Sequence, residues 1–180
     1  MISGFSSLAK TLRRKEGGRT GGTLLCFLGA ALLLAACNKE ALKPDLQSLN
    51  ASDCKDFALK SADSISKTQD CLDYAWNDNV LTISRVNAAF NCCPERISAD
   101  LIVAGDTLII TEREKSSLCD CNCLYDLDYS ITGVRKDKWI IQVVEPYVQS
   151  PDQELIVFEV DFAKVKEGRV CVERTGYPWN

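Results

Sequence analysis

Cysteine content constrains this chain more than any other feature of its sequence. Ten of the 180 residues are Cys and none is His. Cys26 and Cys37 lie in an N-terminal segment that we expect to be processed, and the other eight are Cys54, Cys71, Cys92, Cys93, Cys119, Cys121, Cys123 and Cys171. An even number of cysteines in a small domain is typical of a protein that folds outside the cytoplasm. We therefore predict four disulfides, whose pairing the sequence does not determine.

The first 36 residues have the pattern of a secretory signal. Five basic residues and one acid precede an uncharged run, Thr23–Cys37, that is 15 residues long. A spanning helix needs about 20 apolar residues, so this run suits a signal peptide better than a membrane span. A plain signal peptide and a buried apolar helix are the alternatives.

The run ends in Leu34-Ala35-Ala36-Cys37. This tetrad resembles the lipobox of bacterial lipoproteins. The resemblance implies cleavage of residues 1–36 before Cys37 and acylation of Cys37, by palmitate among other chains, so that the protein sits on a membrane without spanning it. Asn38 differs from the Asp retention signal of proteobacterial lipoproteins, so we expect the outer membrane, with a periplasmic or a surface orientation left open.

Charge limits the partners of the mature chain. Removal of residues 1–36 leaves 16 Lys and Arg against 24 Asp and Glu, a net charge of −8. Such a surface repels phosphates, so nucleic-acid binding is disfavoured. The missing His excludes Ser-His-Asp and Cys-His nucleophile pairs and His metal ligands.

Apolar spacing predicts one all-β domain. We expect a lipidated tether at residues 37–50, an uncertain stretch to Asp70 with a short helix possible, and a single domain over 51–180. From Cys71 onward the apolar residues alternate with period two, as in half-buried strands. The expected strands are Val80–Val86, Ile97–Val103, Thr107–Glu112, Tyr125–Ile131, Trp139–Glu145, Leu155–Phe162 and Arg169–Arg174, with Ala104-Gly105-Asp106 and Gly168 in turns. Seven to nine short strands predict a disulfide-stapled antiparallel β-sandwich, immunoglobulin-like or fibronectin-like, with a small barrel as the alternative.

The cysteine spacing narrows the pairing. Cys119, Cys121 and Cys123 share the parity of Tyr125, so an extended strand would point all three one way and they should bridge to other segments. Adjacent Cys92 and Cys93 would face opposite sides, and we expect at least one of them to pair with the Cys119–Cys123 segment. A metal site of five thiolates is the alternative, but C-x-C-x-C without His departs from the usual zinc knuckle spacing.

The segments Asn91-Cys92-Cys93-Pro94, Asp106–Glu112 and Cys119–Tyr129 together resemble a group of small cysteine-rich lipoproteins from Bacteroidetes. The match covers about residues 70–162. It implies a location in the cell envelope and supports the fold, and it implies no activity.

Three further groups of side chains are candidate sites. Asp126 and Asp128, with Asp120 nearby, could bind Ca²⁺, although two acids on the polar face of a strand are more often solvated. Glu112 and Glu114 could form a carboxylate pair. An aromatic platform for sugars, or simply a buried core, could be built from Tyr74, Trp76, Tyr147, Tyr177 and Trp179.

These patterns favour a non-enzymatic envelope lipoprotein that binds a protein or a glycan, with no catalytic residues, no cofactor and no resident metal. A cysteine-rich metal-binding module and a hydrolytic or redox envelope enzyme are the alternatives. No Gly-rich phosphate loop and no serine nucleophile elbow occur in the sequence.

The lipid anchor can be tested at its one acceptor. Cys37→Ser should release the protein from the membrane fraction or leave it uncleaved, because the acidic chain offers no polybasic patch as a second anchor. Metabolic labelling with a palmitate analogue, followed by membrane fractionation, measures this. Undiminished acyl labelling of Cys37→Ser would contradict the lipobox assignment.

Overall fold

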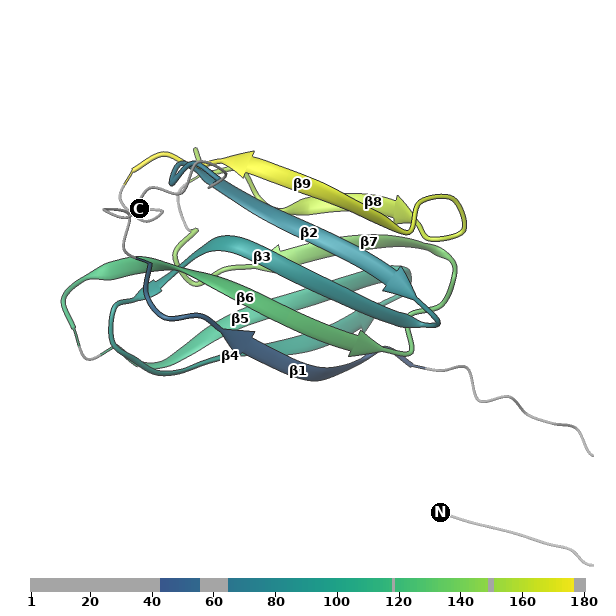
Figure 1. Cartoon of the computed structure of the whole chain (residues 1–180), viewed down its shortest axis with the longest axis horizontal. Coiled ribbons are helices and arrows are strands. Elements are labelled where there is room, and N and C mark those ends of the chain that lie inside the picture. The colour runs from purple at the N-terminus through teal and green to yellow at the C-terminus, as the bar shows by residue number, and fades with distance from the viewer. Residues whose placement is uncertain (1–42, 56–64, 118, 149–150, 177–180) are drawn as a thin grey trace, which may run out of the picture. The chain divides into compact units, whose positions relative to one another are not determined.

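Two β-sheets packed face to face form the domain (Figure 1). The structure is a computed structural model that describes residues 43–55, 65–117, 119–148 and 151–176. The five-stranded sheet has the order β1-β6-β3-β2-β9, and the four-stranded sheet has the order β4-β5-β7-β8. Their bounds are Asp45–Ala51 (β1), Gln69–Asn77 (β2), Val80–Asn91 (β3), Pro94–Ala104 (β4), Thr107–Ser117 (β5), Asn122–Thr132 (β6), Lys138–Val144 (β7), Val157–Asp161 (β8) and Glu167–Glu173 (β9).

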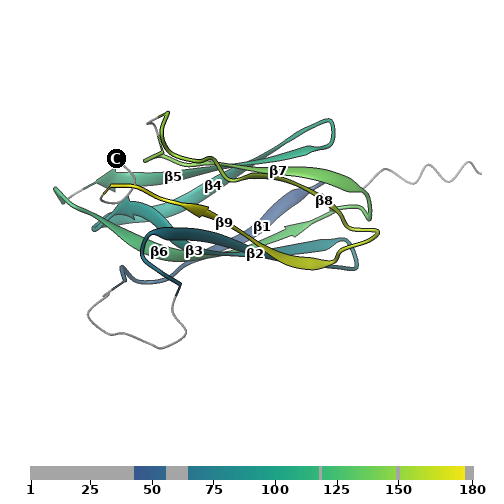
Figure 2. The same cartoon turned by 90° about the horizontal axis from the view of Figure 1, so that it is seen from above.

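The predicted all-β sandwich is confirmed, and Figure 2 shows its two layers. One pair departs from the expected antiparallel pattern, because β5 and β7 run parallel. The chain leaves the four-stranded sheet after β5, runs back along the other sheet as β6, and returns as β7 in the direction of β5. The specific immunoglobulin-like or fibronectin-like layout is not confirmed.

The core lies between the sheets and follows the predicted alternation. Leu127, Tyr129 and Ile131 of β6 point inward, whereas Asp128 is exposed. Val160 and Phe162 are buried and Phe158 packs against the same core. Each large apolar side chain removed from water in this way contributes roughly 1.5–3 kcal/mol. The hydrophobic effect therefore holds the two sheets together over most of their length.

Turn chemistry fixes two hairpins. Asp78 and Asn79 connect β2 to β3 with φ angles of 47° and 66°. Positive φ at both central residues is the pattern of a two-residue type I′ turn, which matches the twist of the strands it joins. The predicted turn at Ala104-Gly105-Asp106 joins β4 to β5, with Gly105 at φ 64°.

A bulge explains why the predicted strand at Val80–Val86 was too short. The pairing register of β3 with β6 shifts between Val86 and Ala88, and Asn87 between them has φ 73°. The extra residue reverses the side-chain parity, so Phe90 points inward although its number has the opposite parity to Ile83. The strand continues to Asn91, but its period-two pattern is interrupted.

Two assignments from the sequence are corrected. The tether assigned to residues 37–50 ends earlier, because β1 begins at Asp45 and pairs with β6. Gly168 lies within β9 rather than in a turn. At this position a Cβ atom would come 2.6 Å from the Tyr74 hydroxyl. Most of the stretch in which a short helix was considered, 56–64, lies outside the described residues. In the described parts of the chain, no helix reaches the length and apolar character that crossing a bilayer requires.

Four disulfides join the eight predicted cysteines. Cys71–Cys171 links β2 to β9 at directly opposed positions. The other three bonds, Cys54–Cys123, Cys92–Cys121 and Cys93–Cys119, gather at the end of the domain where β3 turns into β4 and β5 leads into β6. Both Cys92 and Cys93 thus pair with the Cys119–Cys123 segment. This segment is not one extended strand, since β6 begins only at Asn122.

Candidate functional site

The outer face of the five-stranded sheet carries a shallow, open trough of about 870 Å³. Strand register places its outward side chains in two rows that cross all five strands from β1 to β9. One row is Asn50, Asp128, Ser84, Asp73 and Arg169, and the other is Ser48, Ser130, Thr82, Ala75 and Glu167. Short side chains on the central strands leave this face concave.

Most polar groups of the trough are unused within the domain. Asp73 accepts two hydrogen bonds from Arg169, and the Thr82 hydroxyl donates to the Ala75 carbonyl at 3.1 Å. Within the described part of the chain, no side-chain partner exists for Ser48, Asn50, Ser84, Asp128, Ser130 or Glu167. Some exposed charges outside the trough are paired, among them Lys138 with Glu159.

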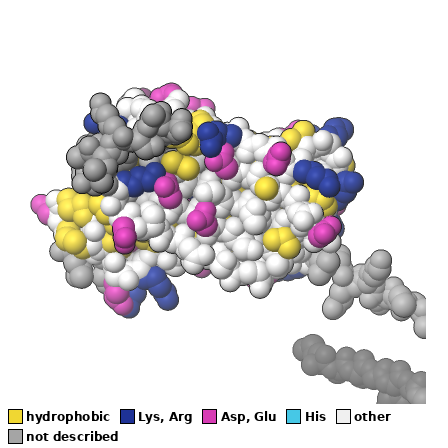
Figure 3. Space-filling view, viewed as in Figure 1, with side chains coloured by type: hydrophobic (Ala, Val, Ile, Leu, Met, Phe, Trp, Pro, Cys, Tyr) yellow, Lys and Arg dark blue, Asp and Glu magenta, His cyan; other side chains and the backbone are white. Residues whose placement is uncertain are grey.

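Figure 3 views this face of the domain. Its centre is mainly backbone and uncharged side chains other than hydrophobic ones, with scattered acidic and basic groups, and hydrophobic side chains are most extensive toward one end.

Beneath the trough, between the sheets, lies a second polar feature, which we call the ionic cluster: Asp70, Arg85, Glu112, Glu145 and Arg174. The side chains of Asp70, Arg85, Glu112 and Arg174 are fully buried, and that of Glu145 is 3% exposed. Asp70, Arg85 and Arg174 come from the five-stranded sheet or its immediate end, whereas Glu112 and Glu145 come from β5 and the end of β7. The cluster therefore joins the two sheets by charge.

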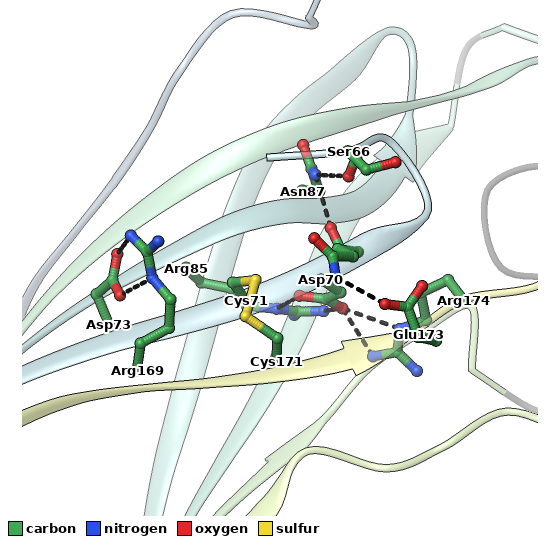
Figure 4. Close-up of a disulfide and its surroundings, with 11 residues drawn as sticks. Ser66, Asp70, Cys71, Asp73, Arg85, Asn87, Arg169, Cys171, Glu173 and Arg174 are labelled. Atoms are coloured by element: carbon green, nitrogen blue, oxygen red, sulfur yellow. Dashed lines mark hydrogen bonds and ion pairs between the residues drawn. A yellow bond between two sulfur atoms is a disulfide. The ribbon is translucent and has the colours of Figure 1, made fainter. Parts of the chain in front are cut away.

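Asp70 lies between the two arginines (Figure 4). Its Oδ1 accepts from Arg85 Nε at 3.0 Å and its Oδ2 from Arg85 Nη2 at 2.5 Å. Arg174 Nη2 donates to the same Oδ2 at 2.7 Å, and Arg174 Nη1 donates to the Glu154 backbone carbonyl at 2.5 Å. The Cys71–Cys171 disulfide lies beside this arrangement.

The opposite sheet supplies two more carboxylates. Glu112 accepts from Arg85 Nη1 and, at 2.5 Å, from the Tyr129 hydroxyl. Glu145 accepts from Arg85 Nη2 and from Arg174 Nη2, the latter at 2.6 Å. Every guanidinium edge of Arg85 thus faces a carboxylate, which is how a buried cation is tolerated.

The cluster holds three carboxylates against two guanidinium groups. Burial raises the pKa of Glu145 to about 7, and the neighbouring Asp70 and Glu112 act in the same direction against the two arginines. Burial alone would lower the pKa of Arg85, but Asp70, Glu112 and Glu145 together raise it well above its ordinary value. Burial and the Glu112 carboxylate raise the pKa of Tyr129. Both Arg85 and Tyr129 therefore stay protonated. Glu145 is the carboxylate that takes up a proton, which reduces the excess negative charge of the cluster.

A third polar group organises the end of the domain that holds three disulfides. The buried Asn91 side chain accepts from the Cys93 backbone N–H at 3.0 Å and donates to the Cys119 carbonyl at 2.6 Å. Glu114 accepts from the Asn91 backbone N–H at 2.7 Å and from the Tyr147 hydroxyl at 2.5 Å. Burial, together with this bond to Glu114, raises the pKa of Tyr147 to about 12.

The three candidate groups from the sequence do not form the sites considered. Asp126 pairs with Lys55, Asp128 lies in the trough and Asp120 lies in the β5–β6 connection. Glu112 belongs to the ionic cluster, and Glu114 binds Asn91 and Tyr147.

Aromatic and sulfur groups are likewise accounted for. Trp76 is buried and Tyr74 packs against the core, while Tyr147 packs against a small cluster of Ala89 and Leu124. Tyr177, Trp179 and the acylation candidate Cys37 lie outside the described residues. All five cysteines of the considered thiolate site are in disulfides, and no group of three or more potential metal ligands occurs among the described residues.

Sequence reasoning missed the ionic cluster, although a signal for it exists. Each of its charged residues continues the inward parity of a strand beyond the last apolar position, or precedes the first. Thus Arg85 follows Leu81 and Ile83, Glu112 follows Leu108 and Ile110, Glu145 follows Ile141 and Val143, Arg174 follows Val172, and Asp70 precedes Leu72. Charges at inward positions predict buried pairs, but this parity does not say which charge meets which.

The two polar features differ in what they can do. The ionic cluster is closed to solvent and has no free surface, so its role is structural. The trough is open and can form hydrogen bonds with a ligand. Comparison of the chain with protein-family models, with curated proteins and with solved structures finds no match.

The raised pKa of Glu145 makes stability depend on pH. The folded protein keeps this proton up to a pKa of about 7, whereas the unfolded chain releases it near 4.5. This contribution is therefore full below pH 4.5 and is lost as the pH rises through 7, at a cost of about 3 kcal/mol. Urea titrations between pH 5 and 8 should show a falling free energy of unfolding in the wild type and a smaller pH dependence in Glu145→Gln.

Glu154→Gln is the matched control, because Glu154 is an exposed acid in the same segment. It should keep the wild-type pH dependence. Equal slopes in Glu145→Gln and Glu154→Gln would contradict the assignment of this proton.

Proposed function

We propose that this protein is a lipid-anchored binding module of the bacterial cell envelope that holds a partner in the trough and carries out no chemistry of its own. The observation that carries the proposal is that six polar side chains on the open face of the five-stranded sheet have no side-chain partner among the described residues: Ser48, Asn50, Ser84, Asp128, Ser130 and Glu167. These side chains are solvated, so a ligand can replace the water that is hydrogen-bonded to them.

The segment between the proposed anchor, Cys37, and the first strand is short. With Cys37 as the first residue of the mature chain, seven residues, 38–44, precede β1. A fully extended segment of this length reaches about 25 Å. Acyl chains on Cys37 would thus keep the domain within one domain diameter of the bilayer, and the outer membrane is the location we propose. Disulfides suit this oxidising compartment.

A binding role fits the trough better than a catalytic one. A serine nucleophile needs a neighbouring base within hydrogen-bond reach. Ser84 and Ser130 have no such partner among the described residues, and Asp73 is engaged by Arg169. The buried Glu112 and Glu145 cannot meet a substrate.

Occupancy of the trough can be measured without knowing the partner. Carbodiimide labelling modifies exposed carboxylates, so Asp128 and Glu167 should react less on intact envelopes than in the purified protein. Asp106, an exposed acid in the β4–β5 turn, serves as the control and should react equally in both. Mass spectrometry of the tryptic peptides gives the ratio.

Protection of Asp128 and Glu167 by at least about twofold is expected for an occupied trough. Equal labelling of all three acids in the two preparations would contradict the proposed binding face.

A further inference from the structure

We infer that the outer face of the four-stranded sheet pairs with the same face of a second copy of this protein. The four-stranded sheet forms one layer of the sandwich (Figure 2), so this face points away from the trough. A pair formed through it would leave both troughs open. Apolar side chains and ion pairs on this face carry the inference, which does not depend on what the trough binds.

Exposed hydrophobic side chains are concentrated on this one face. Five large hydrophobic residues of the described chain are exposed, and four of them belong to β4, β7, β8 or the segment leading into β8: Ile102, Val144, Val157 and Leu155. Ile102 of β4 lies opposite Ile109 of β5. Ile109 lies opposite Gln142 of β7, which in turn lies opposite Val157 of β8. A band of aliphatic side chains thus crosses all four strands and is interrupted at Gln142.

The other outer face of the same sandwich is the comparison. Among the described residues, the two rows of the trough hold no exposed large hydrophobic side chain, and Ala75 is their one apolar member. A sheet face that meets only water commonly carries polar side chains. Contiguous apolar patches on the surface of a soluble protein mark sites that bind another molecule. The face of the four-stranded sheet is therefore the one that calls for a cover.

Charge favours a second copy as that cover. The mature chain has 24 acids against 16 basic residues, so two copies repel each other over most of their surfaces. The outward positions of the four-stranded sheet instead hold three acids and four basic residues: Asp100, Glu159 and Asp161, and Arg96, Arg113, Lys115 and Lys138. Each of these acids has a basic partner within 2.9 Å, namely Arg113, Lys138 and Lys164 in the same order. Two copies can thus meet through this face without an excess of negative charge on either side.

The size of the face fits a weak, reversible pair. Four strands about 4.8 Å apart and about seven residues long, at about 3.3 Å per residue, cover roughly 440 Å² in each copy. Two copies together would cover about 900 Å², the size of a transient interface. A face that meets itself across a two-fold axis closes at two copies. The lipid anchor proposed above would hold the copies in one membrane, which raises their effective concentration.

Sedimentation equilibrium of the purified full-length protein, in a detergent matched in density to the solvent, tests the inference. The wild type should convert reversibly from monomer to dimer as its concentration is raised. Val157→Glu should weaken the dimer at least about tenfold in Kd, because two-fold symmetry buries two unpaired carboxylates at once. Ile102→Glu, at the other end of the aliphatic band, should weaken it in the same way.

Val165→Glu is the matched control. Val165 is 49% exposed and Val157 is 48% exposed, but Val165 lies in the connection between β8 and β9, outside the aliphatic band. The control adds the same charge in place of the same side chain and should leave the dimer Kd unchanged. Urea titrations should give all three variants nearly the stability of the wild type, because each replaced side chain is exposed.

A wild type that stays monomeric at every concentration would overturn the inference, whether a membrane, another protein or water then covers the face. Equal dimer Kd values for Val157→Glu and Val165→Glu would overturn it as well. So would association that continues beyond the dimer, because a face that meets itself closes at two copies. The carboxylate labelling of the trough is a separate measurement, and the proposed function stands or fails on that labelling alone.

Discussion

The buried pairing of Arg85 with carboxylates from both sheets is the interaction on which the arrangement of this domain depends. Apolar contacts between two sheets are non-directional and tolerate small slips. A guanidinium group that must meet Asp70 on its own sheet and Glu112 and Glu145 from the other has few acceptable positions. Removing one partner of such a pair typically costs about 3–5 kcal/mol, because the remaining charge is left buried. We infer that the ionic cluster fixes how the sheets are aligned.

The same strands carry the ionic cluster on one face and the trough on the other. On β2, Asp70 points into the cluster and Asp73 lies in the trough. On β3, Arg85 points into the cluster and its neighbour Ser84 lies in the trough. Because successive side chains of a strand point to opposite faces, the cluster also holds the backbone on which the trough is displayed. The Cys71–Cys171 disulfide adds a covalent link between β2 and β9 at this place.

Local sequence pattern predicted much of the fold and little of the pairing. The alternation of Tyr125, Leu127, Tyr129 and Ile131 identified β6 and its inward face, and Gly105 marked the turn between β4 and β5. The strand β1 was missed because only Leu46 and Leu49 of its residues pack against the core, and a register shift between Leu46 and Ser48 breaks their spacing. The sequence predicted that Cys92 or Cys93 pairs with the Cys119–Cys123 segment, as both do. The complete disulfide pattern could not be predicted, since it depends on which loops meet at one end of the sandwich.

For the candidate sites, too, the sequence predicts which way single side chains point but not which residues meet. Parity alone places Arg85, Glu112 and Glu145 inward, but their meeting depends on strand order, including the parallel β5–β7 pair. The trough has no sequence motif, because its residues come from five strands and only the neighbours β2 and β3 are consecutive in the chain. A row such as Asn50, Asp128 and Ser84 exists only once the register is known.

A double-mutant cycle between Arg85 and Glu112 tests most directly whether buried charge couples the two sheets. The free energy of unfolding in urea would be measured for the wild type, Arg85→Met, Glu112→Leu and the double variant. We expect each single variant to lose several kcal/mol and the double variant to lose less than the sum, with a coupling of at least about 1 kcal/mol. Additive losses would contradict the account, because they would mean that the two side chains act independently.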